Sequence, residues 1–457
     1  MTSSASTSIG GTAPGPRPYP LVGMLPYMRR GLHTFFLEAA RTYGGVVQLG
    51  RPDRLLLADP AAVRHVLVEH QRNYIKGRSA RRLHSIIGNG LPAADGQSWL
   101  AQRRLMQPAF HRQRLGNLAT MITDGARRML EHWDQIANTA QVLDIDHAMA
   151  MLTQQVTVAL MFGGALDDGR AAELGRAFAT LTDDFALRES SPISLPEHWH
   201  TPHGQRVRRA RQTIATYVHE IIAARQQSGG DQHDLLAMLL EATDDTGQSM
   251  DAQQLFDEIR TIFFAGYDTT AHALAWACYL LATHPAVQER AAQEARAVLG
   301  SALPTVADLA QLPYLRMVID ETLRLYPPGW ITARIAVAAD CVSGVAVPAD
   351  AKVLISPYVT HRLPDLWENP DQFDPERFTT ERVSQRPRDA YFPFGMGPRL
   401  CIGYYLALLE LQLTIAMILQ QYELRPASPR PVHPRPVLLL QPHPGVRVSL
   451  RTRRGAS

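Results

Sequence analysis

The sequence predicts a mainly α-helical protein with a minor β region. From about residue 60 to 330, apolar side chains recur mostly at the three- and four-residue spacing of amphipathic helices. One helix is unusually long, because Ser249 or Asp251 can cap its start and Pro285 is the residue that stops it. Its roughly thirty-three positions would extend about 50 Å, so it would cross a whole domain.

Shorter elements lie on both sides of this helix. Residues 46–49 and 55–57 are apolar runs around a turn, which predicts a small hairpin. Helices are expected over 286–299 and 315–326. Strand-like stretches such as 351–355 follow, and a final long helix precedes a strand-like segment at 436–450.

Composition and charge indicate an ordinary globular protein. The chain has 457 residues, 46% hydrophobic and 19% charged, so residues 15–457 are expected to form a single domain after a disordered tail at 1–14. A net charge of +3 is too small to indicate nucleic acid binding. The apolar run 402–419 holds Glu410 and Gln412 in its middle, which predicts a buried helix and no membrane anchor. The three cysteines have no disulfide spacing, which favours the cytoplasm, and a monomer is expected.

The sharpest chemical signal is a glycine-rich loop that presents one cysteine where a helix begins. Its sequence is Phe394-Gly395-Met396-Gly397-Pro398-Arg399-Leu400-Cys401-Ile402-Gly403. Gly397 and Gly403 lack side chains, so a flat macrocycle could approach the backbone. The helix N-terminus and the loop amides favour negative charge on the Cys401 sulfur. An isolated cysteine is more often a buried core thiol, but this setting points to a metal ligand.

This segment resembles the haem-binding loop of the cytochrome P450 family, and three further matches follow the family's order along the chain. The resemblance implies the cytochrome P450 fold, in which a long central helix crosses over a haem b (iron protoporphyrin IX). It also implies that Cys401 is the axial ligand of the haem iron. Phe394 and Gly403 then belong to the cofactor-binding loop.

The second match is Ala265-Gly266-Tyr267-Asp268-Thr269-Thr270, in the middle of the long helix. Gly266 costs about 1 kcal/mol of helix stability relative to alanine, and Thr269 can bond a carbonyl one turn back, which would open a groove. By resemblance, Thr269 assists oxygen activation and Asp268 relays protons from solvent. A glycine-kinked helix with a capped polar pair is the structural alternative.

The third match pairs Glu321 with Arg324 on one helical face. Together with Arg377 in the later segment 373–378, it resembles the family's Glu-Arg-Arg triad. The resemblance implies a buried charge network that locks the region under the haem loop. Its loss would cost several kcal/mol, because a buried charge would lose its partners.

The fourth match sets Trp99 and Arg103 one helical turn apart, both donors suited to carboxylate oxygens. In the family these positions contact a haem propionate, and Arg334 and Arg399 match other propionate-binding positions. By the same analogy, a largely apolar substrate pocket includes five residues. They are Phe264, Ala265, Trp330, Ile331 and Leu439.

The resemblance implies a monooxygenase that inserts one oxygen atom of O2 into a hydrophobic small molecule, by hydroxylation or epoxidation, with a role in secondary metabolism. No flavin or nicotinamide motif is present, so electrons are expected from a ferredoxin or flavodoxin with its reductase. Basic residues suited to an acidic partner are Arg103, Arg104, Arg112 and Arg114. A peroxide-dependent peroxygenase, a haem-thiolate isomerase and a non-enzymatic haem sensor are the alternatives.

Overall fold

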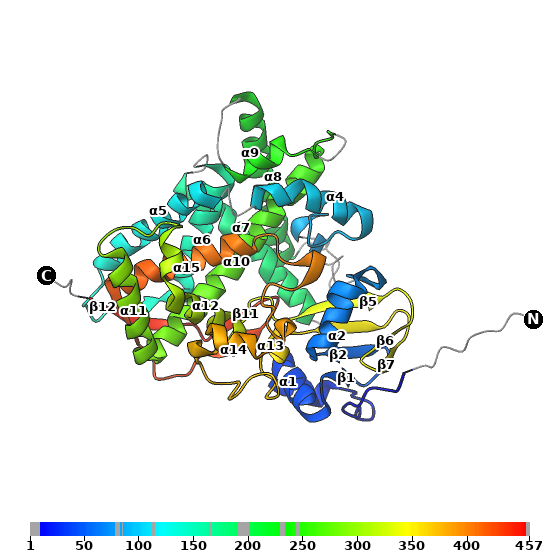
Figure 1. Ribbon diagram of the computed structural model, residues 1–457. Coiled ribbons are helices and arrows are strands. Elements are labelled where there is room, and N and C mark those ends of the chain that lie inside the picture. The colour runs from blue at the N-terminus through cyan, green and yellow to red at the C-terminus, as the bar shows by residue number, and fades with distance from the viewer. Residues whose placement is uncertain are drawn as a thin grey trace, which may run out of the picture. The chain divides into compact units, whose positions relative to one another are not determined.

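A computed structural model describes residues 10–77, 83–84, 86–110, 115–163, 167–190, 201–228, 234–243 and 247–453 (Figure 1). The chain divides into two compact units. The first comprises residues 1–79 and 323–401, and the second comprises residues 80–322 and 402–457. The expectation of a single domain stays a prediction.

The first unit contains the larger sheet and the short helices around it. The sheet has the strand order β1-β2-β8-β5-β3, in which β2 and β8 are parallel and the other neighbours are antiparallel. The elements are η1 (Leu25–Arg30), α1 (Leu32–Tyr43), β1 (Val46–Gln48), β2 (Arg54–Leu57), α2 (Pro60–Arg64), a π turn η2 (His65–Glu69), η3 (Gln71–Asn73), β3 (Tyr74–Ile75), β5 (Thr332–Ala336), β6 (Asp340–Val342), β7 (Val345–Val347), β8 (Lys352–Ile355), α13 (Pro357–Thr360), η7 (Pro375–Phe378), α14 (Thr380–Ser384), η8 (Arg388–Ala390) and η9 (Gly397–Arg399).

The core of this unit lies between the sheet and α2, which Figure 1 shows beside β2. Leu55, Leu57, Val353 and Ile355 alternate along the paired strands β2 and β8 and are fully buried, as expected for the inward face of a sheet. The predicted hairpin is confirmed as β1 and β2. Of the expected tail, residues 1–9 lie outside the described residues, and Gly11 forms a bridge with Val345 of β7.

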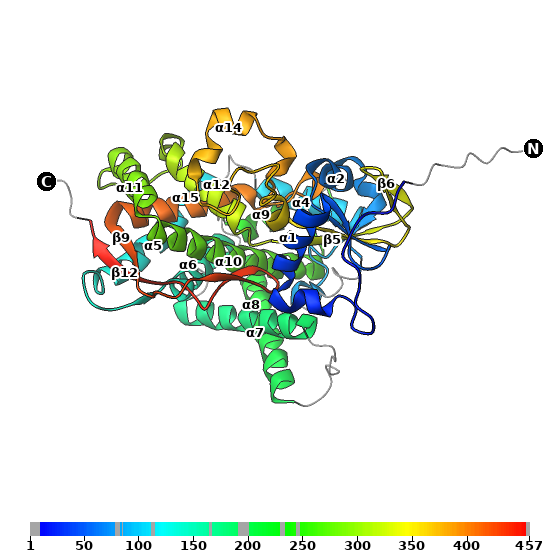
Figure 2. The ribbon, with the colours of Figure 1, turned by 90° about the horizontal axis from the view of Figure 1, so that it is seen from below.

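The second unit is mostly helical (Figures 1 and 2). Helix α12 crosses the division, since its last three residues belong to the first unit. The elements are α4 (Gly96–Met106), η4 (Gln107–Phe110), α5 (Leu115–Asp134), β4 (Leu143–Asp144), α6 (Ile145–Phe162), α7 (Asp168–Ser190), α8 (Pro202–Ser228), α9 (Leu235–Glu241), α10 (Ala252–Thr283), α11 (Pro285–Leu299), η6 (Asp308–Gln311), α12 (Pro313–Leu325), α15 (Tyr404–Gln421), β9 (Tyr422–Pro426), β10 (His433–Pro436), β11 (Leu440–His443) and β12 (Arg447–Thr452).

The long helix predicted from the sequence is α10. It begins after Asp251, whose carboxylate accepts a hydrogen bond from the Gln254 amide at 2.7 Å, and it ends two residues before Pro285. Both views show it side by side with α6 (Figures 1 and 2). Near its C-terminal end, the buried Trp276 indole donates to the Leu440 carbonyl at 3.0 Å, which ties α10 to β11.

Helix α15 follows the cysteine loop and is buried from Leu408 to Leu419. Glu410 and Gln412 are only 3% and 7% exposed, which confirms the prediction of a buried helix. Among the described residues, no helix is long and apolar enough to cross a membrane.

Candidate active site

The loop that carries Cys401 lies at the end of the first unit, just before α15. The Cys401 amide donates to the Phe394 carbonyl at 3.0 Å, and the Gly395 amide donates to the Phe392 carbonyl at 3.0 Å. Met396 packs against the hydrophobic core of the sheet. These contacts anchor the loop to the rest of the first unit, whereas Cys401 itself is exposed and forms no disulfide.

The packing of the chain requires glycine at position 397 of this loop and does not require it at position 403. Gly397 has φ +71°, and a Cβ there would lie 2.3 Å from the Leu67 carbonyl oxygen, so only glycine fits. Gly403 has an ordinary φ of −84°, and a Cβ there would meet no heavy atom of the described residues within 4 Å. The chain's own packing thus leaves open space two residues after the exposed Cys401. This arrangement fits a flat macrocycle bound through sulfur.

His361 links this loop to the predicted arginine network, and no motif in the sequence points to it. The imidazole is fully buried, its Nδ1 donates to the Arg324 carbonyl at 3.2 Å, and its Nε2 accepts from the Phe392 amide at 3.0 Å. Burial, and then the positive charge of Arg324, hold the pKa of His361 well below its ordinary value. A neutral imidazole therefore bridges Arg324 to the start of the cysteine loop.

Glu321, Arg324 and Arg377 are all buried, as the predicted network requires. The Arg324 guanidinium donates to three backbone carbonyls between residues 361 and 372, at 2.7 to 3.0 Å. Arg377 donates to two carbonyls of the same stretch, at residues 368 and 369. Both arginines therefore hold one segment of backbone, residues 361–372. The pairing of Glu321 with them stays a prediction.

The Ala265–Thr270 segment lies on α10 in the second unit. The Thr269 hydroxyl donates to the Ala265 carbonyl at 2.6 Å, which is the one-turn bond expected from the sequence. The helix continues unbroken through this bond. Ala265 is exposed between buried stretches of α10, and a Cβ at Gly266 would meet only Thr157, at 3.5 Å. The packing of the chain therefore leaves room beside the helix here.

Asp268 has a neighbour that the sequence analysis did not identify. The Nε2 atom of His272 lies 3.4 Å from a carboxylate oxygen of Asp268, one helical turn away, without the alignment of a hydrogen bond. Burial, and then the charges of Asp268 and Asp183, raise the pKa of Tyr267 to about 12. The spacing of an acid and a histidine at i and i+4 was the available signal in the sequence.

The predicted propionate-binding residues occur in both units. Trp99 and Arg103 lie four residues apart on α4, and Trp99 is buried. Arg334 on β5 is buried, and its guanidinium donates to a hydroxyl and a backbone carbonyl of its own strand, both at 2.8 Å. Arg399 ends the turn η9, two residues before Cys401. Their contact with a propionate stays a prediction.

The predicted pocket residues also occur in both units. Phe264 and Ala265 lie on α10, Ile331 directly precedes β5, and Leu439 directly precedes β11. The Trp330 side chain is 3% exposed, and its ring stacks on Phe36 with the centroids 6.4 Å apart. Trp330 thus contributes to the core of the first unit, and its role in a pocket stays a prediction.

Comparison with known proteins identifies the family. The cytochrome P450 family model matches residues 13–449, so the chain belongs to the cytochrome P450 family. Members of this family bind haem b through a cysteine thiolate, and the chain is a haem-thiolate monooxygenase, an oxidoreductase that incorporates molecular oxygen. The fold, cofactor and enzyme class predicted from the sequence are confirmed.

Individual relatives agree with this assignment. Cyclooctat-9-en-7-ol 5-monooxygenase of Streptomyces melanosporofaciens is 35% identical, with 91% of this chain and 90% of that protein covered. Cyclooctatin synthase of the same organism is 32% identical, with coverage of 90% and 89%. The crystal structure of the cytochrome P450DA heme domain superimposes with a TM-score of 0.87 at 26% identity and covers 98% of both chains.

Proposed function

We propose that Cys401 is the axial ligand of the haem iron in this monooxygenase. The observation that carries the proposal is the exposed Cys401 on an anchored loop, next to a glycine that the chain's own packing does not require. When bound, haem supplies the binding and activation of O2, and thiolate donation favours cleavage of the oxygen–oxygen bond. Arg399 and Arg334, together with Trp99 and Arg103, would hold the two propionates.

Thr269 and Asp268 are proposed to deliver protons during turnover. Because the Thr269 hydroxyl proton is directed to the Ala265 carbonyl, its oxygen presents lone pairs that can accept a hydrogen bond. Asp268 lies within reach of His272, so this carboxylate has a titratable neighbour on the same helix. In the cytochrome P450 family the corresponding segment assists oxygen activation, and the same role is proposed for it here.

The axial-ligand assignment is tested by Cys401→Ser, with Cys341→Ser as the matched control. Both thiols are exposed, but only Cys401 lies in the haem loop. Loss of the thiolate-type carbon monoxide spectrum in Cys401→Ser alone is expected. A thiolate spectrum retained in Cys401→Ser would refute the assignment.

The role of Thr269 is tested by Thr269→Ala, with Thr261→Ala as the control. Thr261 makes the same one-turn bond, to the Asp257 carbonyl at 2.8 Å, two turns earlier on α10. Thr269→Ala is expected to divert reducing equivalents from product to peroxide, while Thr261→Ala keeps the coupling ratio. An unchanged ratio in Thr269→Ala would instead favour the peroxide-dependent alternative.

A cytochrome P450 monooxygenase requires a redox partner, O2 and a hydrophobic substrate. Substrate size and polarity are proposed to resemble those of the Streptomyces relatives, whose names denote an unsaturated cyclic alcohol and cyclooctatin, in keeping with a role in secondary metabolism. The pocket would then include Phe264, Ala265 and Leu439. Titration with cyclic alkenols, steroids and fatty acids should produce a spin-state change only with the matching class. A response to fatty acids alone would contradict the proposal.

An acidic ferredoxin or flavodoxin is the proposed electron donor. Arg103 and Arg104 lie on α4, and the predicted Arg112 and Arg114 lie outside the described residues. Because exposed charges are screened over about 8 Å at physiological salt, the rate of reduction should fall as ionic strength rises. A rate independent of ionic strength would contradict the proposal. The cytoplasmic location and the monomeric state stay predictions.

A further inference from the structure

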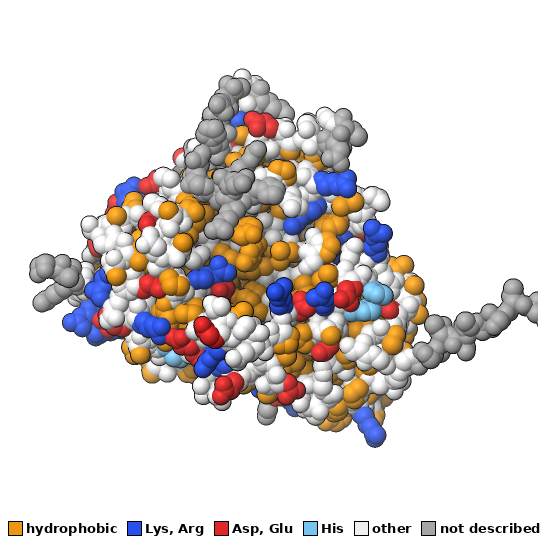
Figure 3. All heavy atoms as spheres, in the orientation of Figure 1, with side chains coloured by type: hydrophobic (Ala, Val, Ile, Leu, Met, Phe, Trp, Pro, Cys, Tyr) orange, Lys and Arg blue, Asp and Glu red, His pale blue; other side chains and the backbone are white. Residues whose placement is uncertain are grey.

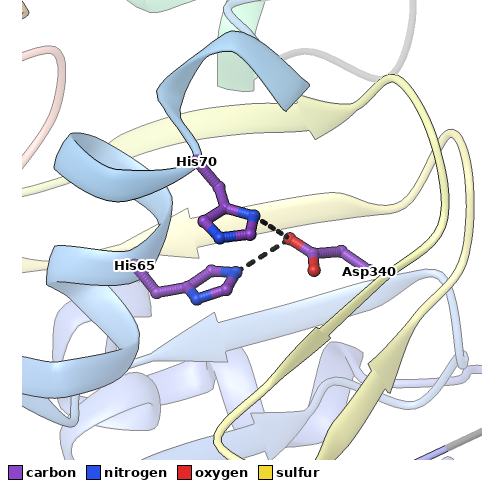
Figure 4. A group of neighbouring side chains, drawn as sticks. All are labelled: His65, His70 and Asp340. Atoms are coloured by element: carbon purple, nitrogen blue, oxygen red, sulfur yellow. Dashed lines mark hydrogen bonds and ion pairs between the residues drawn. The ribbon is translucent and has the colours of Figure 1, made fainter.

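Two histidines and one aspartate of the first unit, none of them in the cysteine loop 394–403, converge on a single point. Figure 4 shows one ring nitrogen of His65 and one of His70 directed at the same carboxylate oxygen of Asp340. The His65 Nε2 lies 2.8 Å from this oxygen and the His70 Nδ1 lies 3.7 Å from it. Within the described part of the chain, these three side chains form a group whose possible ligand atoms all lie within 4.8 Å of one another.

The backbone brings the two histidines together by leaving the α-helical path. Residues five apart on an α-helix point in different directions, but α2 continues into the π turn His65–Glu69, and the His70 amide donates to the His65 carbonyl at 2.8 Å. The two rings consequently stack, with centroids 4.0 Å apart and an angle of 22° between their planes. Such π turns are uncommon, and they occur frequently at functional sites.

Other groups hold the Asp340 carboxylate in place. The Tyr74 hydroxyl donates to the oxygen that faces the histidines at 2.8 Å, and the Cys341 amide donates to the other oxygen at 2.8 Å. Burial opposes ionisation, but the hydrogen bonds from His65 and Tyr74 keep the pKa of Asp340 below its ordinary value. A carboxylate that neighbouring groups hold in place by hydrogen bonds is typical of metal ligands.

We propose that His65, His70 and Asp340 bind a divalent transition cation, with Zn²⁺ as the representative ion. Two imidazoles and one carboxylate form a ligand set that zinc uses, with a fourth position left to water. Ligand atoms about 2.0–2.1 Å from a tetrahedral zinc ion are about 3.3 Å apart. The separations of 2.8 and 3.7 Å lie on either side of this value, and the third, between the two histidine nitrogens, is no more than 4.8 Å.

The ion could enter from solvent. The His70 side chain is 52% exposed, while those of His65 and Asp340 are 19% and 13% exposed. In the face shown in Figure 3, histidine surface lies beside acidic surface over the region where Figure 1 places α2. An ion here would have one open side, as in zinc sites that retain a water molecule.

A hydrogen bond between His65 and Asp340 would not by itself explain the position of His70. At 3.7 Å, His70 is too far from the carboxylate for a hydrogen bond, yet its Nδ1 faces the same oxygen. A cation therefore accounts for the position of His70 as well as that of His65.

The test uses tag-free, haem-loaded protein that has been dialysed against EDTA and then titrated with Zn²⁺ in competition with a chromophoric chelator. Bound zinc is counted by elemental analysis after equilibrium dialysis. His70→Gln and Asp340→Asn remove one ligand each, and His70→Gln alters a side chain that is 52% exposed. His132→Gln is the control, because His132 is an exposed histidine elsewhere, on α5.

One zinc ion per chain is expected, bound at least tenfold more weakly in both ligand variants and unchanged in His132→Gln. Tyr74→Phe, which removes the hydroxyl that orients Asp340, should weaken binding by about tenfold. Zinc should also raise the melting temperature of the unaltered protein and not that of His70→Gln, because a ligand stabilises only the folded state that binds it. Stoichiometric binding that persists in both ligand variants, or no binding by the unaltered protein, would overturn the proposal.

Discussion

Glu410 should make the stability of this protein decrease as the pH rises, and Glu410→Gln should remove that decrease. The carboxyl group lies in the middle of α15, 3% exposed, and its Oε1 atom has no hydrogen-bond partner among the described residues. Burial raises the pKa of Glu410 from 4.5 to about 8. Glutamine has the size and neutral charge of the protonated acid, so the substitution imitates the form present at neutral pH.

The magnitude follows from proton linkage. Below about pH 4.5 the carboxyl is protonated in both the folded and the unfolded chain. Between 4.5 and about 8 the unfolded chain loses the proton while the folded chain keeps it, so the free energy of unfolding falls by about 1.4 kcal/mol per pH unit. The whole interval corresponds to about 5 kcal/mol, an upper limit because the folded chain can relax around the charge.

The assay is urea unfolding of both proteins from pH 5 to 9, followed by tryptophan fluorescence. Other titrating groups cancel in the difference between the two proteins. Glu410→Gln should match the unaltered protein within about 1 kcal/mol at pH 5 and exceed it by several kcal/mol at pH 8.5. Glu381→Gln, at an exposed position on α14, controls for the loss of a carboxylate. A difference that stays constant over this range would refute the reasoning.

Three further predictions concern buried polar contacts. Because His361 is buried in its neutral form, protonation of the unfolded chain below about pH 6.5 should destabilise the protein, and His361→Gln should give a shallower fall in melting temperature between pH 6.5 and 5. In Arg324→Lys, one ammonium cannot reach the three carbonyls that the guanidinium binds, so the free energy of unfolding should fall by about 3 kcal/mol or more. Haem retention, measured by the ratio of haem to protein absorbance, should fall as well. Trp276→Phe leaves the buried Leu440 carbonyl without its donor and should cost about 1–3 kcal/mol in urea unfolding.

Local signals predicted the parts of the fold that depend on local interactions. Asp251 and Pro285 set the limits of α10 because a capping carboxylate and a missing amide act within one turn. The apolar residues on both sides of Glu410 indicated a buried helix, and this pattern is also a local signal. The segment 436–450, in contrast, was expected as a single strand-like stretch. It contains the last residue of β10, then β11 and the first part of β12, because the pairing of β12 with β9 is long-range.

Side chains whose roles depend on partners far away in the sequence, or on an irregular backbone turn, could not be predicted. No motif surrounds His361 in the sequence. Its link to the cysteine loop is the hydrogen bond that it accepts from the Phe392 amide, thirty-one residues later. His65 and His70 are five residues apart, a spacing that fits neither the helical nor the strand period, and only the π turn makes them neighbours. Cys401 and Thr269 could be predicted as site residues because they lie within contiguous motifs, and their roles stay predictions.

The contrast between Gly397 and Gly403 has a consequence for mutational tolerance. In a library of single substitutions sorted only for folded, protease-resistant chains, position 397 should accept nothing but glycine, since any Cβ collides with the Leu67 carbonyl. Position 403 should accept small residues in that sort, and alanine at 266 should even be enriched, because it gains about 1 kcal/mol of helix propensity. If the same library is sorted for haem retention, 403 and 266 should become as restrictive as 397. Selection at those two positions would then act on the holoenzyme and not on the polypeptide.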